Sequence, residues 1–163
     1  MMSTPRLSLV LPFVALALVL ATNAAAGVAD RGAAGSGATL SLFNGKGLAA
    51  ITSNDGSVLG TMVQGKITLV DYARGTPTTF DPRDWGCEKK RRPNRKTVIC
   101  SGSELKFSVA GGAWFLSLNG RGIFASAVVT GKVLLRGTRG TFSINNGRRR
   151  PWPEIAHTYK LGG

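Results

Sequence analysis

The chain has 163 residues, and its 21 lysine and arginine residues against 8 acidic residues give a formal net charge of +13. A charge of this size attracts polyanions whatever the fold. With one histidine and two cysteines, the composition excludes a structural zinc module, which needs about four such ligands.

Residues 1–26 are predicted to be a secretory signal peptide. One positive charge, Arg6, precedes the uncharged run "LSLVLPFVALALVLA", and Ala24 and Ala26 stand in an A-x-A arrangement before Gly27. The alternative is an uncleaved N-terminal membrane anchor, but the run is shorter than a bilayer span of about 20 residues and contains Pro12. We therefore expect a signal helix that is removed after Ala26, and a secreted or cell-envelope location.

Residues 27–38 are predicted to be a flexible linker. They consist mainly of glycine and alanine, and Val28 is their only large apolar side chain, so they cannot bury enough surface to offset the entropy of ordering. Residues 39–163 are predicted to form a single β domain, which is long enough to enclose its own core.

Short apolar or alternating runs recur from Thr39 onward between glycine, asparagine and aspartate residues. In "ELKFSV", Leu105, Phe107 and Val109 alternate with polar residues, which is typical of a strand with one buried and one solvated face. The sequences "SLNG", "GG" and "INNG" supply residues that tolerate positive φ, as hairpin turns require. About ten short strands joined by tight turns predict an all-β fold, either an antiparallel β-sandwich or a small barrel.

Two stretches of this region resemble each other. "LSLFNGKGLAAI" at 40–51 aligns with "FLSLNGRGIFASAV" at 115–128, and "GKITLV" at Gly65 aligns with "GKVLLR" at Gly131. The separation in the chain between Asn44 and Asn119 in the first pair differs from that between Gly65 and Gly131 in the second. The domain is therefore either a pair of pseudo-equivalent halves or a set of hairpins that share the same glycine-rich turns. Two units of this size are too few for a solenoid.

The two cysteines are predicted to form a disulfide. Export places Cys87 and Cys100 in an oxidising compartment, and a redox motif would need a shorter spacing. The strand-like "KTVIC" follows the loop between them, so the cysteines are expected to face each other across the mouth of a hairpin. Closing a loop of this size contributes about 3 kcal/mol, mainly by restricting the unfolded chain.

Six basic side chains crowd the loop inside this disulfide, around an expected turn at Pro93-Asn94. They are Lys89, Lys90, Arg91, Arg92, Arg95 and Lys96. Because like charges repel, the loop must point into water or onto an anion. Two interpretations stay open: a solvated loop that keeps the protein soluble, or an anion-binding site.

The sequence predicts no catalytic constellation. His157 lies alone near the C-terminus, where a general base would lack a partner. Asp81 and Asp84 in "FDPRDWG" are neighbouring acids that a glycosidase could use. Pro82 and Arg83 between them instead predict a turn with local ion pairs. The G-x-G sequences precede strands, so they lack the helix N-terminus that holds a nucleotide phosphate.

A second basic segment, "NNGRRRPWP", places Arg148, Arg149 and Arg150 directly before Pro151 and Trp152. Arginines beside a rigidly presented tryptophan can bind anions, with stacking as a further contribution. The alternative is a solvated loop whose Trp152 packs back onto the sheet.

The segment "GRGIFASAVVTG" at 120–131 follows the pattern G-x-G-I-x-x-SAV-x-x-G, and "GKVLLRG" and a final "YKL" come after it. In this order, and with one disulfide, the chain resembles small, largely uncharacterised exported β proteins that are common in actinobacteria. The resemblance covers most of the chain after the signal peptide. It implies export and a compact β fold, and it supplies no activity and no catalytic residue.

These observations predict a basic, exported, non-enzymatic β protein that acts at the cell envelope as a binding or structural module. The expected partners are anionic cell-wall polymers or lipid head groups, since an exported protein seldom meets nucleic acid and no nucleic-acid motif is present. The first alternative is a protein–protein interaction module or inhibitor that presents the disulfide-closed loop, and the second is a hydrolase. No small-molecule substrate, metal or cofactor is expected.

Overall fold

The structure is a computed structural model that describes residues 37–73 and 77–162. All of these residues belong to one unit of the chain, Ala34–Gly163. The predicted signal peptide and residues 27–36 of the predicted linker lie outside the described residues. Within the described ranges, no helix is long and apolar enough to cross a bilayer.

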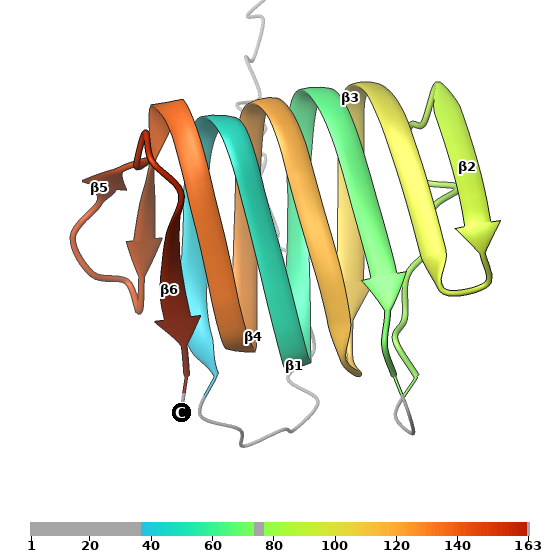
Figure 1. Cartoon of the computed structure of the whole chain (residues 1–163), viewed down its shortest axis with the longest axis horizontal. Coiled ribbons are helices and arrows are strands. Elements are labelled where there is room, and N and C mark those ends of the chain that lie inside the picture. The colour runs from blue at the N-terminus through green and yellow to red at the C-terminus, as the bar shows by residue number, and fades with distance from the viewer. Residues whose placement is uncertain (1–36, 74–76, 163) are drawn as a thin grey trace, which may run out of the picture. The chain divides into compact units, whose positions relative to one another are not determined.

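The described residues form six strands, two of which are unusually long (Figure 1). β1 (Ala38–Asp71) has 34 residues and β4 (Trp114–Ile144) has 31, against a usual strand length of about 5 to 6. The others are β2 (Lys89–Asn94), β3 (Thr97–Ala110), β5 (Arg150–Pro151) and β6 (His157–Leu161). Every pairing is antiparallel, which confirms the predicted all-β antiparallel class.

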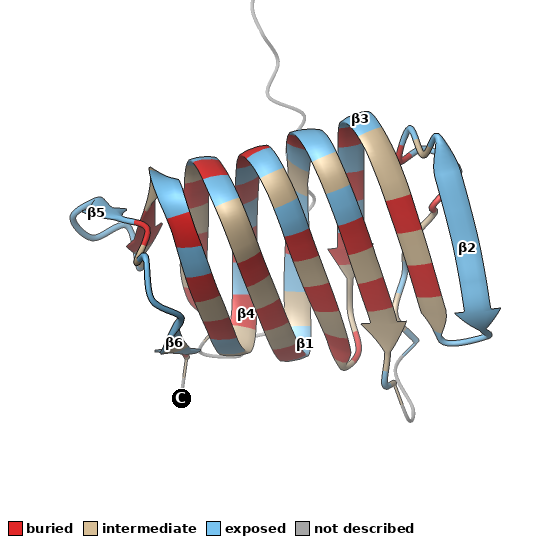
Figure 2. Cartoon of the chain, turned by 45° about the horizontal axis from the view of Figure 1, so that its top comes forward, coloured by how far each residue is buried: buried red, intermediate tan, exposed pale blue. Residues whose placement is uncertain are grey.

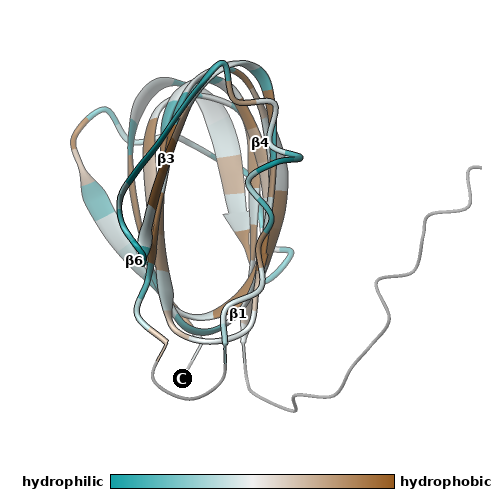
Figure 3. Cartoon of the chain, turned by 90° about the vertical axis from the view of Figure 1, so that its right-hand side faces the viewer, coloured by the Kyte–Doolittle hydropathy of each residue, from teal (hydrophilic) through white to brown (hydrophobic). Residues whose placement is uncertain are grey.

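β1 and β4 wind around each other as a coil, which the register shows directly. Leu40 of β1 pairs with Ala127 on one side and with Ile144 on the other, so β4 completes one turn between these two partners. Ala127 in turn pairs with both Leu40 and Val58, so one turn of β1 runs from Leu40 to Val58. Seen end-on, the strands trace a flattened ring around the core (Figure 3).

β3 extends the same coil. It pairs with the second half of β1, from Ser57 opposite Ala110 to Val70 opposite Thr97. Only residues 111–113 separate β3 from β4. The described chain therefore follows two antiparallel paths, 38–71 and 97–144, wound about one axis. The sheet is not closed into a barrel, because β2 forms one edge and β5 and β6 lie at the other.

A row of glycines lets the strands bend without breaking the ladder. Across five adjacent strand segments the row is Gly137, Gly47, Gly120, Gly65 and Gly102, each paired with the next. A Cβ on Gly47 would lie 2.1 Å from the carbonyl oxygen of Arg136, and one on Gly65 would lie 2.3 Å from that of Asn119. Neither position can carry a side chain, because each of these carbonyl oxygens belongs to the backbone of the paired strand and cannot move away.

The glycine signals separate into true turns and bends inside strands. "GG" is a turn, since Gly111 and Gly112 have φ of +70° and +63° between β3 and β4. "INNG" is also a turn, in which the Gly147 N–H donates to the Ile144 carbonyl at 3.0 Å. The predicted turn at "SLNG" is wrong, because these residues lie inside β4. Fewer turns and longer strands explain why six strands are described where about ten were predicted.

The core fills the inside of the coil and follows the predicted alternation (Figure 2). In β3, Leu105, Phe107 and Val109 are buried while Lys106 and Ser108 are exposed. β1 likewise buries every second residue over much of its length. The strands thus wrap one apolar face inward and leave the other in water.

A buried tryptophan lies beside each edge of the sheet. Trp85, in the segment before β2, accepts a hydrogen bond at its carbonyl from the Lys106 N–H of β3 at 3.1 Å. Trp152, just after β5, donates from its indole Nε1 to the Thr141 carbonyl at 3.2 Å. A Cβ on Gly45 would lie 2.2 Å from the Trp152 ring, so only glycine lets the indole lie there.

Candidate anion-binding surfaces

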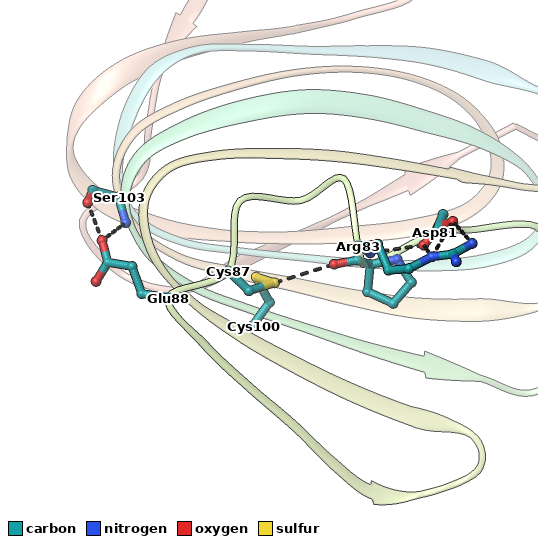
Figure 4. The surroundings of a disulfide bond; sticks show 7 residues. Asp81, Arg83, Cys87, Glu88, Cys100 and Ser103 are labelled. Carbon is teal, nitrogen blue, oxygen red and sulfur yellow. Dashed lines mark hydrogen bonds and ion pairs between the residues drawn. A yellow bond between two sulfur atoms is a disulfide. The ribbon is translucent and has the colours of Figure 1, made fainter.

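The predicted disulfide is present, with the Cα atoms of Cys87 and Cys100 5.3 Å apart (Figure 4). Cys100 is buried in β3, and its register partner in β2 is Lys90 rather than Cys87. The prediction that the two cysteines face each other across the hairpin mouth is therefore wrong in detail. The bond instead ties the segment before β2 to the buried side of β3.

The segment before β2 carries the predicted acidic turn. Asp81 accepts hydrogen bonds from the Arg83 side chain, at 2.7 Å for the closest pair, and from the Arg83 backbone N–H at 2.9 Å. These bonds lower the pKa of Asp81 to about 2 and raise the pKa of Arg83. A carboxyl group that acts as a general acid needs a raised pKa. The geometry thus matches the predicted turn with a local ion pair.

Glu88 stands at the foot of the hairpin. Its carboxylate accepts hydrogen bonds from the Ser103 hydroxyl and from the Ser103 backbone N–H. The side-chain bond first, then the backbone bond and the charge of Lys89, lower the pKa of Glu88. Both acids beside the hairpin are therefore held in their charged form.

β2 and the turn after it present the six predicted bases to solvent (Figure 2). We call Lys89, Lys90, Arg91, Arg92, Arg95 and Lys96 the hairpin cluster. The turn lies at Arg95-Lys96 rather than at the predicted Pro93-Asn94, which belong to β2, and the Asn94 side chain accepts a hydrogen bond from the Lys96 N–H at 2.9 Å. No ion pair between described residues involves any member of the cluster. β2 is also an edge strand, where charges and Pro93 hinder pairing with another chain.

The C-terminal arginines lie at the opposite edge of the sheet from the hairpin cluster. The Arg149 guanidinium lies 3.8 Å from the centre of the Phe43 ring. That of Arg150 lies 4.8 Å from the Phe142 ring and 5.1 Å from the Tyr159 ring. Two of the three predicted arginines therefore pack on aromatic rings of this chain, and the two predicted basic segments do not meet.

The prediction that Trp152 could stack on a ligand is wrong, because this side chain is only 4% exposed. The alternative interpretation, in which the tryptophan packs back onto the sheet, is confirmed. His157 begins β6, as predicted, and its ring lies 4.6 Å from that of Tyr159. In the ranges that the structure describes, no three His, Cys, Asp or Glu side chains are grouped to hold a metal ion.

A further basic group, which was not predicted, lies beside the glycine row. Lys46 pairs with Arg121 on one side and with Arg139 on the other, so three basic residues stand side by side on adjacent strand segments. Lys66 and Arg136 flank the same glycines from the other side, next to Gly65 and Gly137 in the chain. We call these five exposed residues, Lys46, Lys66, Arg121, Arg136 and Arg139, the rim cluster.

The rim cluster has no acidic ion-pair partner among the described residues, and a hydrogen bond holds one of its members in place. Between described residues, none of the five forms an ion pair. Gln64 pairs with Arg121 in the register, and its side-chain oxygen accepts a hydrogen bond from Arg121 Nε at 3.1 Å. The signal in the sequence was the similarity of "NGKG" to "NGRG". These motifs are direct neighbours in the sheet, with Lys46 opposite Arg121.

One part of the surface carries several exposed apolar side chains. Leu59 and Val63 of β1 are each 51% exposed, and Phe124 and Val128 of β4 are 43% and 51% exposed. They lie on neighbouring strand segments, since Leu59 pairs with Ser126. Val63 directly precedes Gln64, the partner of Arg121, so this face borders the rim cluster.

Comparison of the chain with protein-family models, with curated proteins and with solved structures found no match.

Proposed function

We propose that this protein is an exported, non-enzymatic binding protein of the cell envelope, and that the hairpin cluster binds anionic polymers or lipid head groups there. The observation that carries this proposal is a run of six exposed bases without ion-pair partners among the described residues, on a hairpin next to a disulfide. These bases repel one another in the free protein. A bound polyanion removes that repulsion.

The number of charges sets the expected strength and salt dependence of binding. A single exposed ion pair contributes about 1 kcal/mol or less, so affinity must come from several contacts at once. If six phosphates are engaged, the log–log slope of affinity against salt is about −4 to −5, because each contact releases condensed counterions. Binding should therefore weaken steeply between about 50 and 300 mM salt.

The test compares variants of equal net charge in co-sedimentation with purified envelope. The hairpin variant is R91Q/R92Q/R95Q, and the matched control is K106Q/K132Q/R148Q, which removes three exposed bases outside both clusters. The hairpin variant should lose most of the binding at low salt and show a slope smaller by about 2 to 3. The control should bind almost as well as the wild type. Equal losses in the two variants would reduce the effect to net charge and refute a binding role for the hairpin.

A second candidate is a protein–protein interaction module, which the exposed apolar face favours. Single exposed apolar residues are ordinary, whereas Leu59, Phe124 and Val128 lie together on neighbouring segments. Binding through this face would resist salt and would be lost in a Leu59→Ser/Phe124→Ser variant. Binding that fades with salt and survives this double substitution would exclude the second candidate.

A further inference from the structure

We propose that the rim cluster and the hairpin cluster form one continuous track that binds a linear phosphate polymer laid across the strands. The proposal rests on the proposed function only for the hairpin end of the track. The rim end is carried by a separate observation, the register of β1, β3 and β4.

Two rows of residues run along the glycine row, one on each side. The first row is Arg139, Lys46, Arg121, Gln64 and Ser103, in which each residue pairs with the next. The second row is Arg136, Leu48, Asn119, Lys66, Ser101 and Lys89, again with each residue paired to the next. Lys89 belongs to the hairpin cluster. The second row therefore joins the rim cluster to the hairpin cluster through consecutive register pairs, with uncharged residues between its three bases.

The length of the track distinguishes a polymer from a single head group. Neighbouring strands lie about 4.8 Å apart, so the five steps from Arg136 to Lys89 span about 24 Å. One phosphate or one lipid head group can contact only one part of such a track. A linear polyanion that crosses the strands can contact bases at both ends.

The arrangement of the rim bases lowers the stability of the protein when no ligand is bound. Like charges directly opposite each other destabilise a sheet, and Lys46 has a basic partner on both sides. Neither row contains an acidic residue, and the acid that contacts a row, Glu88 at Ser103, lies at the end remote from Lys46. A polar uncharged residue would satisfy the fold equally well at these exposed positions, so the bases are explained by an anion that neutralises them.

The surroundings of the bases fit a phosphate backbone. Glycines separate the two rows along most of their length, with Thr138 added between Arg136 and Arg139 and the Glu88 side chain lying against Gly102 at the hairpin end. Gln64 leaves the two terminal nitrogens of Arg121 available, and a guanidinium matches the oxygens of a phosphate in a fork. Binders of single-stranded nucleic acid add aromatic platforms for the bases. Neither row contains an aromatic residue, and Phe43 is covered by Arg149.

The experiment measures binding of long-chain sodium polyphosphate and of tripolyphosphate to the purified protein. The rim variant is K46Q/R121Q/R139Q, and the hairpin and control variants are those above, so all three have the same net charge. For long-chain polyphosphate at about 100 mM salt, we expect the rim and hairpin variants each to bind at least about tenfold more weakly than the wild type, with slopes smaller by about 2 to 3. The control variant should bind within about threefold of the wild type, and tripolyphosphate should bind the wild type far more weakly than the long chain does.

Each outcome separates the track from the proposed function. If the rim variant binds like the control while the hairpin variant loses affinity, the hairpin function stands and the track is refuted. If tripolyphosphate binds as tightly as the long chain, the site takes a single small anion and the track is refuted. Tighter binding of single-stranded DNA, of a sulfated polysaccharide or of vesicles with anionic lipid would overturn the assigned ligand class.

A ligand-free measurement distinguishes a binding role of the rim bases from a structural one. If the bases exist for a ligand, removing their mutual repulsion should leave the rim variant at least as resistant to urea as the wild type. If they support the fold, the rim variant should unfold at a lower urea concentration than the control variant. The second result would overturn the proposal.

Discussion

The hairpin cluster and the rim cluster are both basic, yet the chain builds them in opposite ways. The hairpin bases lie close together in the chain, from Lys89 to Lys96, and a disulfide lies beside them. The rim bases come from positions between 46 and 139, and only the winding of β1 and β4 brings them together. A local cluster depends on local order, whereas a cluster made by register depends on the whole fold. Substitutions that disturb one and spare the other therefore test this difference.

The largest loss of stability is expected from Gly47→Ala, which changes the glycine row beside the rim cluster. The new Cβ would lie 2.1 Å from the Arg136 carbonyl oxygen, and Gly47 has φ of +147°, so both a clash and backbone strain result. We expect a loss of about 3 to 5 kcal/mol in the free energy of unfolding, measured by urea denaturation.

Gly102→Ala is the matched control for this prediction, because Gly102 belongs to the same row. There the Cβ would lie 3.1 Å from Cγ of the Glu88 side chain, which can move, and 3.1 Å from its backbone nitrogen. We expect a loss of no more than about 1 kcal/mol. Similar losses in the two variants would mean that the row is not held by the close approach of neighbouring strands.

The next effect concerns the hairpin. Cys87→Ser/Cys100→Ser should lower the free energy of unfolding by about 3 kcal/mol, because the unfolded chain regains the freedom of the closed loop. In polyphosphate binding by this variant, the rim cluster should account for the part of the salt slope that is retained. The check is thermal and urea unfolding of this variant beside the wild type with and without reductant. An unchanged midpoint in both comparisons would show that the bond does not stabilise the fold.

Local patterns in the sequence were sufficient to predict the hairpin cluster and the disulfide beside it, but they did not predict the rim cluster. Alternation in "ELKFSV" predicted which side chains of β3 are buried, and the count and spacing of cysteines predicted the disulfide. A glycine in a β protein, however, signals either a turn or a close approach of two backbones. "GG" at 111–112 is the first and Gly120 in "SLNG" is the second, and only the neighbouring strand distinguishes them.

The spacing of the glycines held information about the coil. Gly47, Gly56 and Gly65 are evenly spaced, and Gly102, Gly111 and Gly120 repeat the same spacing. Two such steps, from Gly47 to Gly65, cover the same length of chain as one turn of β1, so a glycine recurs at each half turn. The burial of Trp152 could not be inferred in the same way, because it depends on Gly45, which is far away in the chain and leaves room for the indole.

The smallest effect concerns Asp81, one of the two acids beside the hairpin. Hydrogen bonds from Arg83 favour the charged form of Asp81 and hold its pKa at about 2, below the ordinary value of about 3.9. The stabilising contribution of this group is therefore complete above about pH 4 and is lost as the pH falls through about 2. In Arg83→Gln the side-chain bonds are removed while the backbone N–H remains, so the pKa of Asp81 should rise toward its ordinary value without reaching it. An NMR titration of the Asp81 carboxyl carbon measures both midpoints, with Arg148→Gln as the control that removes an arginine elsewhere. A wild-type midpoint near 4 would mean that the turn beside the disulfide is open in solution, and the hairpin would then be held by the disulfide and the β2–β3 pairing without help from this ion pair.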